Sequence, residues 1–240
     1  MRLGRRQCLC VSLAAAASRV LSACSARTEG PPTAQGAILT VYGGTPSREQ
    51  LNSADAFVQT TAALLGVPTP RNIRYTWNEG ITDPLGCAGG GVTDPITSDV
   101  FAGEFPHYHE LVHSVALPLG LPPHFFIEGL AEAFSPRPDF LCPQPVRGPF
   151  ATPIEWLDSR VLRGAYGVER GRLDHELYIH AGVFTRTMLR EFGRERYLRL
   201  YRSLTYFADL AEVRRAFVAV LGITIEEALA LARNANTSEL

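Results

Sequence analysis

Residues 106–135 read PHYHELVHSVALPLGLPPHFFIEGLAEAFS, and they predict two consecutive helices joined by a short loop. Pro106 suits the first turn of a helix, where its missing N–H costs no hydrogen bond. The first helix should end near Leu117, because Pro118 follows it. A pair of prolines opens the second helix, which should close after Ser135, ahead of two further prolines.

The first of these helices carries a pattern typical of metal binding. His109 and His113 are four residues apart, so their imidazoles share one helix face and can point at one metal ion. A catalytic zinc ion takes three protein ligands and keeps an open position for water, and a carboxylate from the second helix would complete that set. Glu110 is offset by about 100° from His109. It is therefore predicted to face the zinc-activated water as general base without binding the ion.

The second helix resembles a known family. Residues 123–134, PHFFIEGLAEAF, are similar to the P-x-W-L-x-E-G-[LF]-A-E-Y segment of gluzincin zinc metallopeptidases, with Phe125 where Trp is usual. The compact peptidase MA-like members are the closest in pattern, and zinc aminopeptidases are more distant. The resemblance implies that Glu128 is the third ligand of one Zn²⁺ ion. Glu128 follows His113 by only fifteen positions, a tighter spacing than in the larger gluzincins, which indicates a minimal enzyme. The metzincin pattern is excluded, because it needs Gly and His where the chain has Ala116 and Leu119.

Further residues are expected to support this site. Glu132 lies one turn after Glu128 and is placed to hydrogen-bond a ligand imidazole. The segment Tyr178 to Phe184 resembles the Y-x-x-x-G/S-F segment of the same family, which implies that Tyr178 donates to the oxyanion, with His180 as the second candidate. The alternative is that Tyr178 packs in the core and bonds a backbone carbonyl.

The remaining histidines are expected to be less important. His107 should point to another side of the helix, as a surface or minor structural residue. His124 is expected at the surface of a helix start, with the cleft as the alternative, and His175 is expected to be exposed.

The resemblance implies a zinc metallopeptidase that hydrolyses peptide bonds. Zinc aminopeptidases hold the substrate amine with an upstream G-x-M-E-N segment, whereas residues 86–91 read GCAGGG and contain no Glu, which favours an endopeptidase. Two alternatives remain open. One is a catalytically lapsed, membrane-anchored binding lipoprotein with the same fold. The other is a structural zinc protein, in which Glu110 would be idle and a fourth protein ligand would be usual.

The N-terminus resembles that of an exported bacterial lipoprotein. Residues 1–23 combine an Arg-rich start with an apolar stretch, and Leu21–Cys24 resembles a lipobox, so Cys24 is expected to carry lipid. The expected location is the bacterial cell envelope, periplasmic or cell-surface, with envelope peptides or proteins as substrates. Arg5-Arg6 partly matches a twin-arginine signal. An uncleaved anchor and a wrongly placed start codon are the alternatives.

Two cysteines, Cys87 and Cys142, remain after Cys24. In an oxidising compartment they would form a disulfide, and the alternative is a pair of independent buried thiols.

Composition disfavours nucleic acid as a partner. All 23 basic residues are Arg, and removing the four in residues 1–23 leaves a formal charge of −5. No second apolar run is long enough to span a bilayer.

The remaining pattern predicts an α+β fold. Residues 24–36 should form a tether and 37–240 one domain. Strands are expected at 37–42 and 72–77, a helix from Ser47 with a Gln50 capping box, and loop at 79–105. Helices are then expected at about 152–163, 175–191, 194–205, 208–221 and 224–234, the last capped by Thr224 and Glu227. The zinc cleft should lie between this small sheet-bearing part and the helical C-terminal part.

Overall fold

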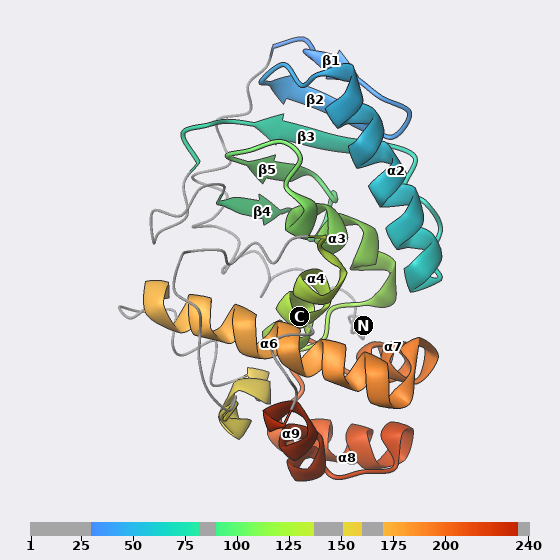
Figure 1. Cartoon of the computed structure of the whole chain (residues 1–240), viewed down its shortest axis with the longest axis vertical. Coiled ribbons are helices and arrows are strands. Elements are labelled where there is room, and N and C mark those ends of the chain that lie inside the picture. The colour runs from blue at the N-terminus through green and yellow to red at the C-terminus, as the bar shows by residue number, and fades with distance from the viewer. Residues whose placement is uncertain (1–29, 82–89, 137–150, 160–169, 235–240) are drawn as a thin grey trace, which may run out of the picture.

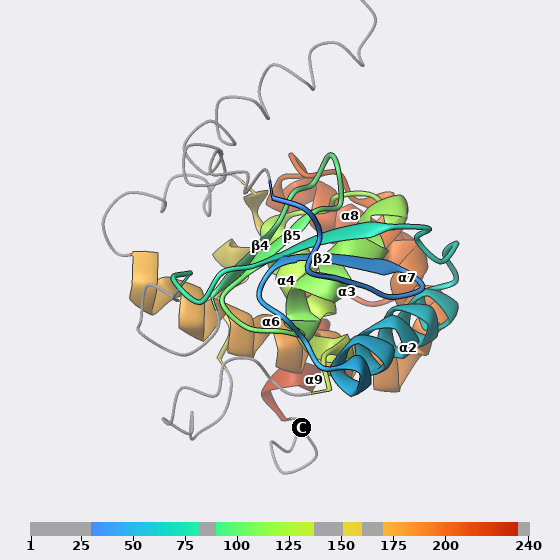
Figure 2. The ribbon, with the colours of Figure 1, turned by 90° about the horizontal axis from the view of Figure 1, so that it is seen from above.

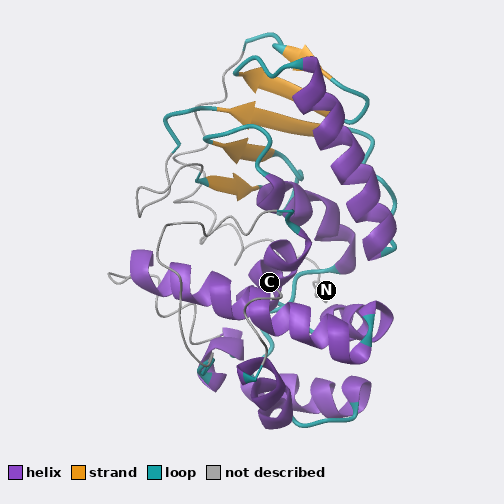
Figure 3. Ribbon diagram, viewed as in Figure 1, coloured by secondary structure: helices purple, strands orange, loops and turns teal. Residues whose placement is uncertain are grey.

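The chain forms a mixed β-sheet in its N-terminal part and a group of helices that lies mainly in its C-terminal part, as Figure 3 shows. The computed structural model describes residues 30–81, 90–136, 151–159 and 170–234, with side chains from residue 176 in the last range. These residues form five strands in the N-terminal part and seven α-helices, mostly in the C-terminal part. The predicted α+β class is confirmed.

The sheet has a parallel centre and antiparallel edges. Its strands lie in the order β1-β2-β3-β5-β4 (Figure 1). The pairs β2–β3 and β3–β5 are parallel, and β1 and β4 are antiparallel to their neighbours. The bounds are Ala34–Gln35 (β1), Leu39–Gly43 (β2), Ile73–Trp77 (β3), Gly91–Thr93 (β4) and Val100–Ala102 (β5).

Helix α2, Arg48–Leu65, connects the parallel strands β2 and β3. Ser47 and Gln50 form the predicted capping box, since each side chain bonds the backbone N–H of the other residue. Inside the helix, the carboxylate of Asp55 accepts from the backbone N–H groups of Ile38 and Leu39 at 3.2 and 3.0 Å. These bonds fix α2 against the start of β2.

The two predicted central helices are present as α3, Tyr108–Ala116, and α4, His124–Phe134, with a 3₁₀ turn η1, Leu117–Leu119, between them. Helix α4 ends at Phe134 with Ser135 as its C-cap, within one residue of the predicted end. The placement of Pro106 in the first helical turn was wrong, because His107 is the N-cap and Pro106 precedes it. The loop prediction for 79–105 was also wrong in part. It missed β4 and β5, which have three residues each. These strands are defined by their hydrogen bonds to neighbouring strands, and three residues are too few to show an alternating sequence pattern.

The C-terminal part is helical, as predicted. It contains α6 (Arg170–Phe192), α7 (Arg194–Ser203), α8 (Leu210–Leu221) and α9 (Ile225–Arg233). Thr224 and Glu227 form the expected capping box of α9. The helix expected at 152–163 is represented by a 3₁₀ turn, η2, at Ile154–Leu157, and residues 160–169 lie outside the described residues.

One continuous hydrophobic core joins the two parts. It runs from the sheet, where Leu39 and Tyr75 are fully buried, to Phe184 on α6 and Phe217 on α8. Helices α3 and α4 lie between the sheet and α6 (Figures 1 and 2). The fold therefore places the H-E-x-x-H helix and its partner at the centre of the molecule.

Some of the predictions concern residues outside the described ranges. The signal peptide, Cys24, Cys87 and Cys142 all belong to this group. Among the helices that are described, none has the length and apolar character needed to cross a membrane.

Candidate metal centre

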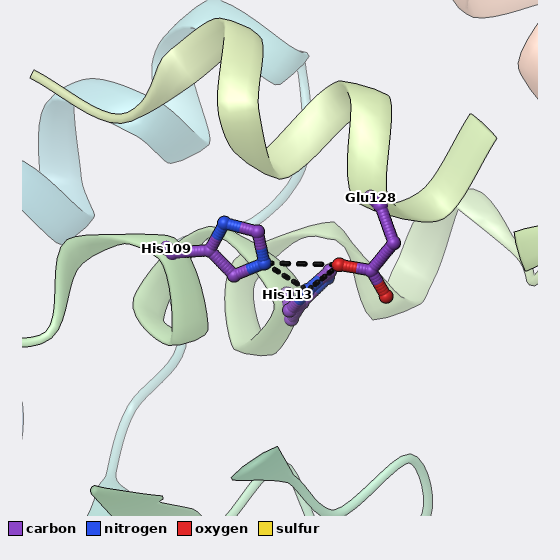
Figure 4. A group of neighbouring side chains, drawn as sticks. All are labelled: His109, His113 and Glu128. Carbon is purple, nitrogen blue, oxygen red and sulfur yellow. Dashed lines mark hydrogen bonds and ion pairs between the residues drawn. The ribbon is translucent and has the colours of Figure 1, made fainter. Parts of the chain in front are cut away.

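Three ligand-type atoms from α3 and α4 converge on one point. His109 Nε2 lies 3.0 Å from Glu128 Oε2, His113 Nε2 lies 2.9 Å from His109 Nε2, and His113 Nε2 lies 3.2 Å from Glu128 Oε2. Figure 4 shows the two imidazoles and the carboxylate directed at one another. Two ligands at ~2.05 Å from a tetrahedral zinc ion are about 3.3 Å apart, so this triangle has nearly the size that such an ion requires. The group could hold a metal ion.

Helix geometry and burial produce this convergence. The i, i+4 spacing puts His109 and His113 on one face of α3, and α4 packs across that face to bring in Glu128. The side chains of His109, His113 and Glu128 are 6%, 13% and 7% exposed. These three side chains would therefore shield a bound ion from bulk water. His113 is the most exposed of the three.

A second layer of contacts holds His109 from behind. Its Nδ1 lies 2.8 Å from Oε1 of Glu132, which is 2% exposed. The guanidinium of Arg186, on α6, donates to the backbone carbonyl of Glu132. A carboxylate on Nδ1 orients the imidazole so that Nε2 faces the position of the ion.

The charges of this buried group depend on one another. Burial lowers the pKa of His109, but hydrogen bonds to Glu128 and Glu132 and their negative charges outweigh burial and raise that pKa well above 6.5. Burial raises the pKa of Glu128, but the charges of His113 and His124 and the imidazole hydrogen bonds lower it well below 4.5. The carboxylates of Glu128 and Glu132 thus favour a positive charge close to them, which a divalent cation would supply.

Glu110 follows His109 on α3, about 100° further around the helix. Its side chain is buried, and its Oε2 accepts a hydrogen bond of 2.7 Å from the hydroxyl of Thr93 on β4. A Cβ atom built on Gly91 would lie 2.6 Å from Cγ of Glu110, so the carboxylate side chain lies directly against the strand. Neither contact was expected from the sequence.

The structure separates the two candidate oxyanion donors. The ring of Tyr178 lies edge-on to the imidazole of His109, with 5.5 Å between centroids. His180 is two positions further along α6, about 200° around the helix. Its Nδ1 lies 2.9 Å from the hydroxyl of Thr152, and its ring contacts Trp156. Burial lowers the pKa of His180, a shift that the charge of Glu176 opposes.

Two of the minor histidines take the second of the two placements that the sequence left open, a structural contact for His107 and the cleft side for His124. His107 is buried, not at the surface, because it is the N-cap of α3: its backbone N–H donates to the hydroxyl of Tyr75 at 3.0 Å, and its Nδ1 accepts from Glu110 N at 3.4 Å. His124 is 23% exposed, with its Nδ1 3.3 Å from Oε1 of Glu128. The side chain of His175 lies outside the described residues.

The contact of His124 with Glu128 had a usable signal in the sequence, the i, i+4 spacing that made the cleft an alternative for this residue. Thr93, Gly91 and Arg186 reach the site from β4 and α6 across long stretches of chain, and no local pattern marks such contacts.

Comparisons with protein-family models, with curated proteins and with solved structures gave no match to this chain.

Proposed function

We propose that the chain is a zinc-dependent metallopeptidase, a member of the gluzincins that cuts within peptide chains rather than at their N-terminus. The observation that carries the proposal is the triangle of His109 Nε2, His113 Nε2 and Glu128 Oε2, with Glu110 buried on the helix that carries the two histidines. Two neutral imidazoles and one carboxylate are a ligand set typical of catalytic zinc.

Each residue of the site has a role in this mechanism. A zinc ion held by the three ligands would supply Lewis acidity for the scissile carbonyl and for the attacking water. Glu110 takes the proton of that water and returns it to the leaving amine nitrogen, because a carboxylate at this position can do both. Tyr178, whose ring lies against His109, donates its O–H to the oxygen on which negative charge develops. Glu132 keeps the His109 imidazole in its ligating orientation.

The first experiment measures zinc per chain by elemental mass spectrometry on residues 25–240, purified without chelators. We expect about one equivalent in the unaltered protein and loss of that zinc in His113→Ala, because a ligand is removed. A folded protein that binds no zinc, even after reconstitution, would overturn the proposal.

The second experiment separates catalysis from binding. Glu110→Gln is expected to keep zinc and to lose hydrolysis of unstructured peptides, because the amide cannot take a proton. Unchanged behaviour of this variant in every assay would favour the lapsed binding lipoprotein or a structural zinc site.

A third experiment tests the oxyanion donor. Tyr178→Phe should keep zinc and lower turnover strongly. Full turnover of this variant would remove Tyr178 from the mechanism.

We also propose that the protein acts in the bacterial cell envelope, held by lipid on Cys24, on envelope peptides or proteins. The proposal is supported by the lipobox-like residues Leu21–Cys24 after an apolar stretch. Labelled palmitate supplied to a bacterial host should enter the full chain and not the Cys24→Ser variant; equal labelling of both would contradict it.

A further inference from the structure

Helix α3 presents two different faces to two different neighbours. The His109 and His113 face meets α4, whereas Glu110 and Ser114, also four residues apart, meet the β4–β5 hairpin. The hydroxyl of Ser114 donates to the backbone carbonyl of Ser98 in that hairpin at 2.9 Å. The hairpin is therefore held at two successive turns of α3.

At the first of these turns, Thr93 fixes Glu110 by two contacts. The Thr93 hydroxyl lies 2.7 Å from Oε2 of the Glu110 carboxylate and 2.9 Å from the Glu110 backbone carbonyl. The hydroxyl has one proton, which these two acceptors of Glu110 share, so Thr93 lies between the end of the Glu110 side chain and the Glu110 backbone carbonyl. This arrangement restricts the side-chain torsions of Glu110.

Gly91 makes room for the carboxylate on the same strand face as Thr93, because residues i and i+2 of a strand point to the same side. A Cβ at residue 91 would lie 2.6 Å from Cγ and 3.2 Å from Cδ and Oε1 of Glu110. Any larger residue would displace the side chain. Strand β4 is itself fixed by antiparallel pairing with β5, Gly91 opposite Ala102 and Thr93 opposite Val100.

We infer that Gly91 and Thr93 form a seat for Glu110, hereafter the β4 seat, which holds the carboxylate in one orientation against strand β4 through the bond to Oε2. The role of the seat in catalysis rests on the proposed function, in which Glu110 is the general base. Gly91 and Thr93 are positioning residues: the proton moves from the attacking water to the Glu110 carboxylate and then to the leaving amine nitrogen, and neither seat residue takes part in that transfer.

The existence of the seat is tested without activity, on metal-free protein, by a double-mutant cycle in urea unfolding. Thr93→Val should lower the unfolding midpoint in the unaltered chain and lower it less in the Glu110→Ala background, because the carboxylate partner is then absent and only the backbone carbonyl of residue 110 remains to accept from Thr93. Thr187→Val is the matched control, since the Thr187 hydroxyl donates to the Val183 carbonyl at 2.8 Å within α6. Its effect should be equal in both backgrounds. Additive effects of Thr93→Val and Glu110→Ala would overturn the seat.

The positioning role is tested by turnover of the zinc-loaded enzyme. Thr93→Val should lower kcat about tenfold or more, with KM and zinc content unchanged, because a mobile base is seldom in the productive geometry. Thr93→Ser keeps the hydroxyl and should restore most of kcat.

Gly91→Ala should also lower kcat by displacing the carboxylate. Gly36→Ala is its control, since that Cβ would lie 2.3 Å from Asp55 Oδ2 and disturb α2 instead of the site. Full kcat in Thr93→Val would overturn the positioning role. If the unaltered chain binds zinc but hydrolyses no peptide, the proposed peptidase activity is wrong. The double-mutant unfolding cycle would still decide whether the β4 seat exists.

Discussion

Two of the three residues of the metal group, His109 and Glu128, have one atom directed at the group and another held by a neighbour. His109 presents Nε2 to the group and Nδ1 to Glu132, and Glu128 presents Oε2 to the imidazoles and Oε1 to His124. Such outer contacts fix the orientation of a ligand before the ion arrives, which lowers the entropy lost on binding. The affinity for zinc should therefore depend on residues that never touch it.

His124 provides a test at this scale. His124→Ala should weaken zinc binding about tenfold, because the second carboxylate oxygen of Glu128 loses its donor and the carboxylate can rotate. His124→Asn should lose less affinity, since its amide nitrogen occupies nearly the position of Nδ1. Competition with a chromophoric chelator measures both. Wild-type affinity in His124→Ala would show that Glu128 is held by the helix alone.

At the scale of elements, the site depends on close packing between α4 and α6. A Cβ built on Gly129 would lie 2.4 Å from Thr185 Oγ1 and 2.6 Å from the backbone carbonyl oxygen of Ala181. The second of these contacts is with backbone and cannot be relieved by a side-chain rotation. Gly129 thus sets the distance between α6, which carries Tyr178, and α4, which carries Glu128 in the preceding position.

Gly129→Ala should force α4 and α6 apart. We expect a loss of about 1–3 kcal/mol in the free energy of unfolding, as for other overpacked cores, together with weaker zinc binding. Urea unfolding and chelator competition measure the two effects. Gly30→Ala is the control, because nothing lies within 4 Å of a Cβ there. Equal stability and affinity in Gly129→Ala and the unaltered chain would contradict this account of the packing.

The elements differ in how far the sequence determines them locally. Most of the helices were predictable, and so were the caps of α2 and α9, because the Ser47–Gln50 and Thr224–Glu227 boxes and the prolines around α4 act within a few residues. Strands β4 and β5 were not, since three residues carry too little periodicity and their ladders come from β3 and from each other. The spacing of His109, His113 and Glu128 predicted one metal-binding group, because two helices that are consecutive in the sequence supply all three side chains. The contact of Thr93 with Glu110 requires the sheet as well.

At the scale of the molecule, the metal group lies where the two parts of the core meet. Helix α3 packs on the sheet through β4 and β5, and α4 packs on α6, so an ion bound between α3 and α4 would join both parts. Because one continuous hydrophobic core spans the chain, the described residues should unfold in a single transition.

Zinc should then stabilise the whole fold rather than one segment. A ligand that binds only the folded chain adds RT ln(1 + [L]/Kd) to the free energy of unfolding, about 4 kcal/mol when free zinc is 1,000 times Kd. For a chain of roughly 200 residues this raises Tm by about 10 °C. Calorimetry with and without zinc should show one transition displaced upward, and the displacement should disappear in His113→Ala while it persists in Thr187→Val. An equal rise in His113→Ala would mean that zinc binds elsewhere on the chain. A second transition that zinc does not move would mean that the two parts of the core unfold separately, so that the ion stabilises only the part that holds α3 and α4.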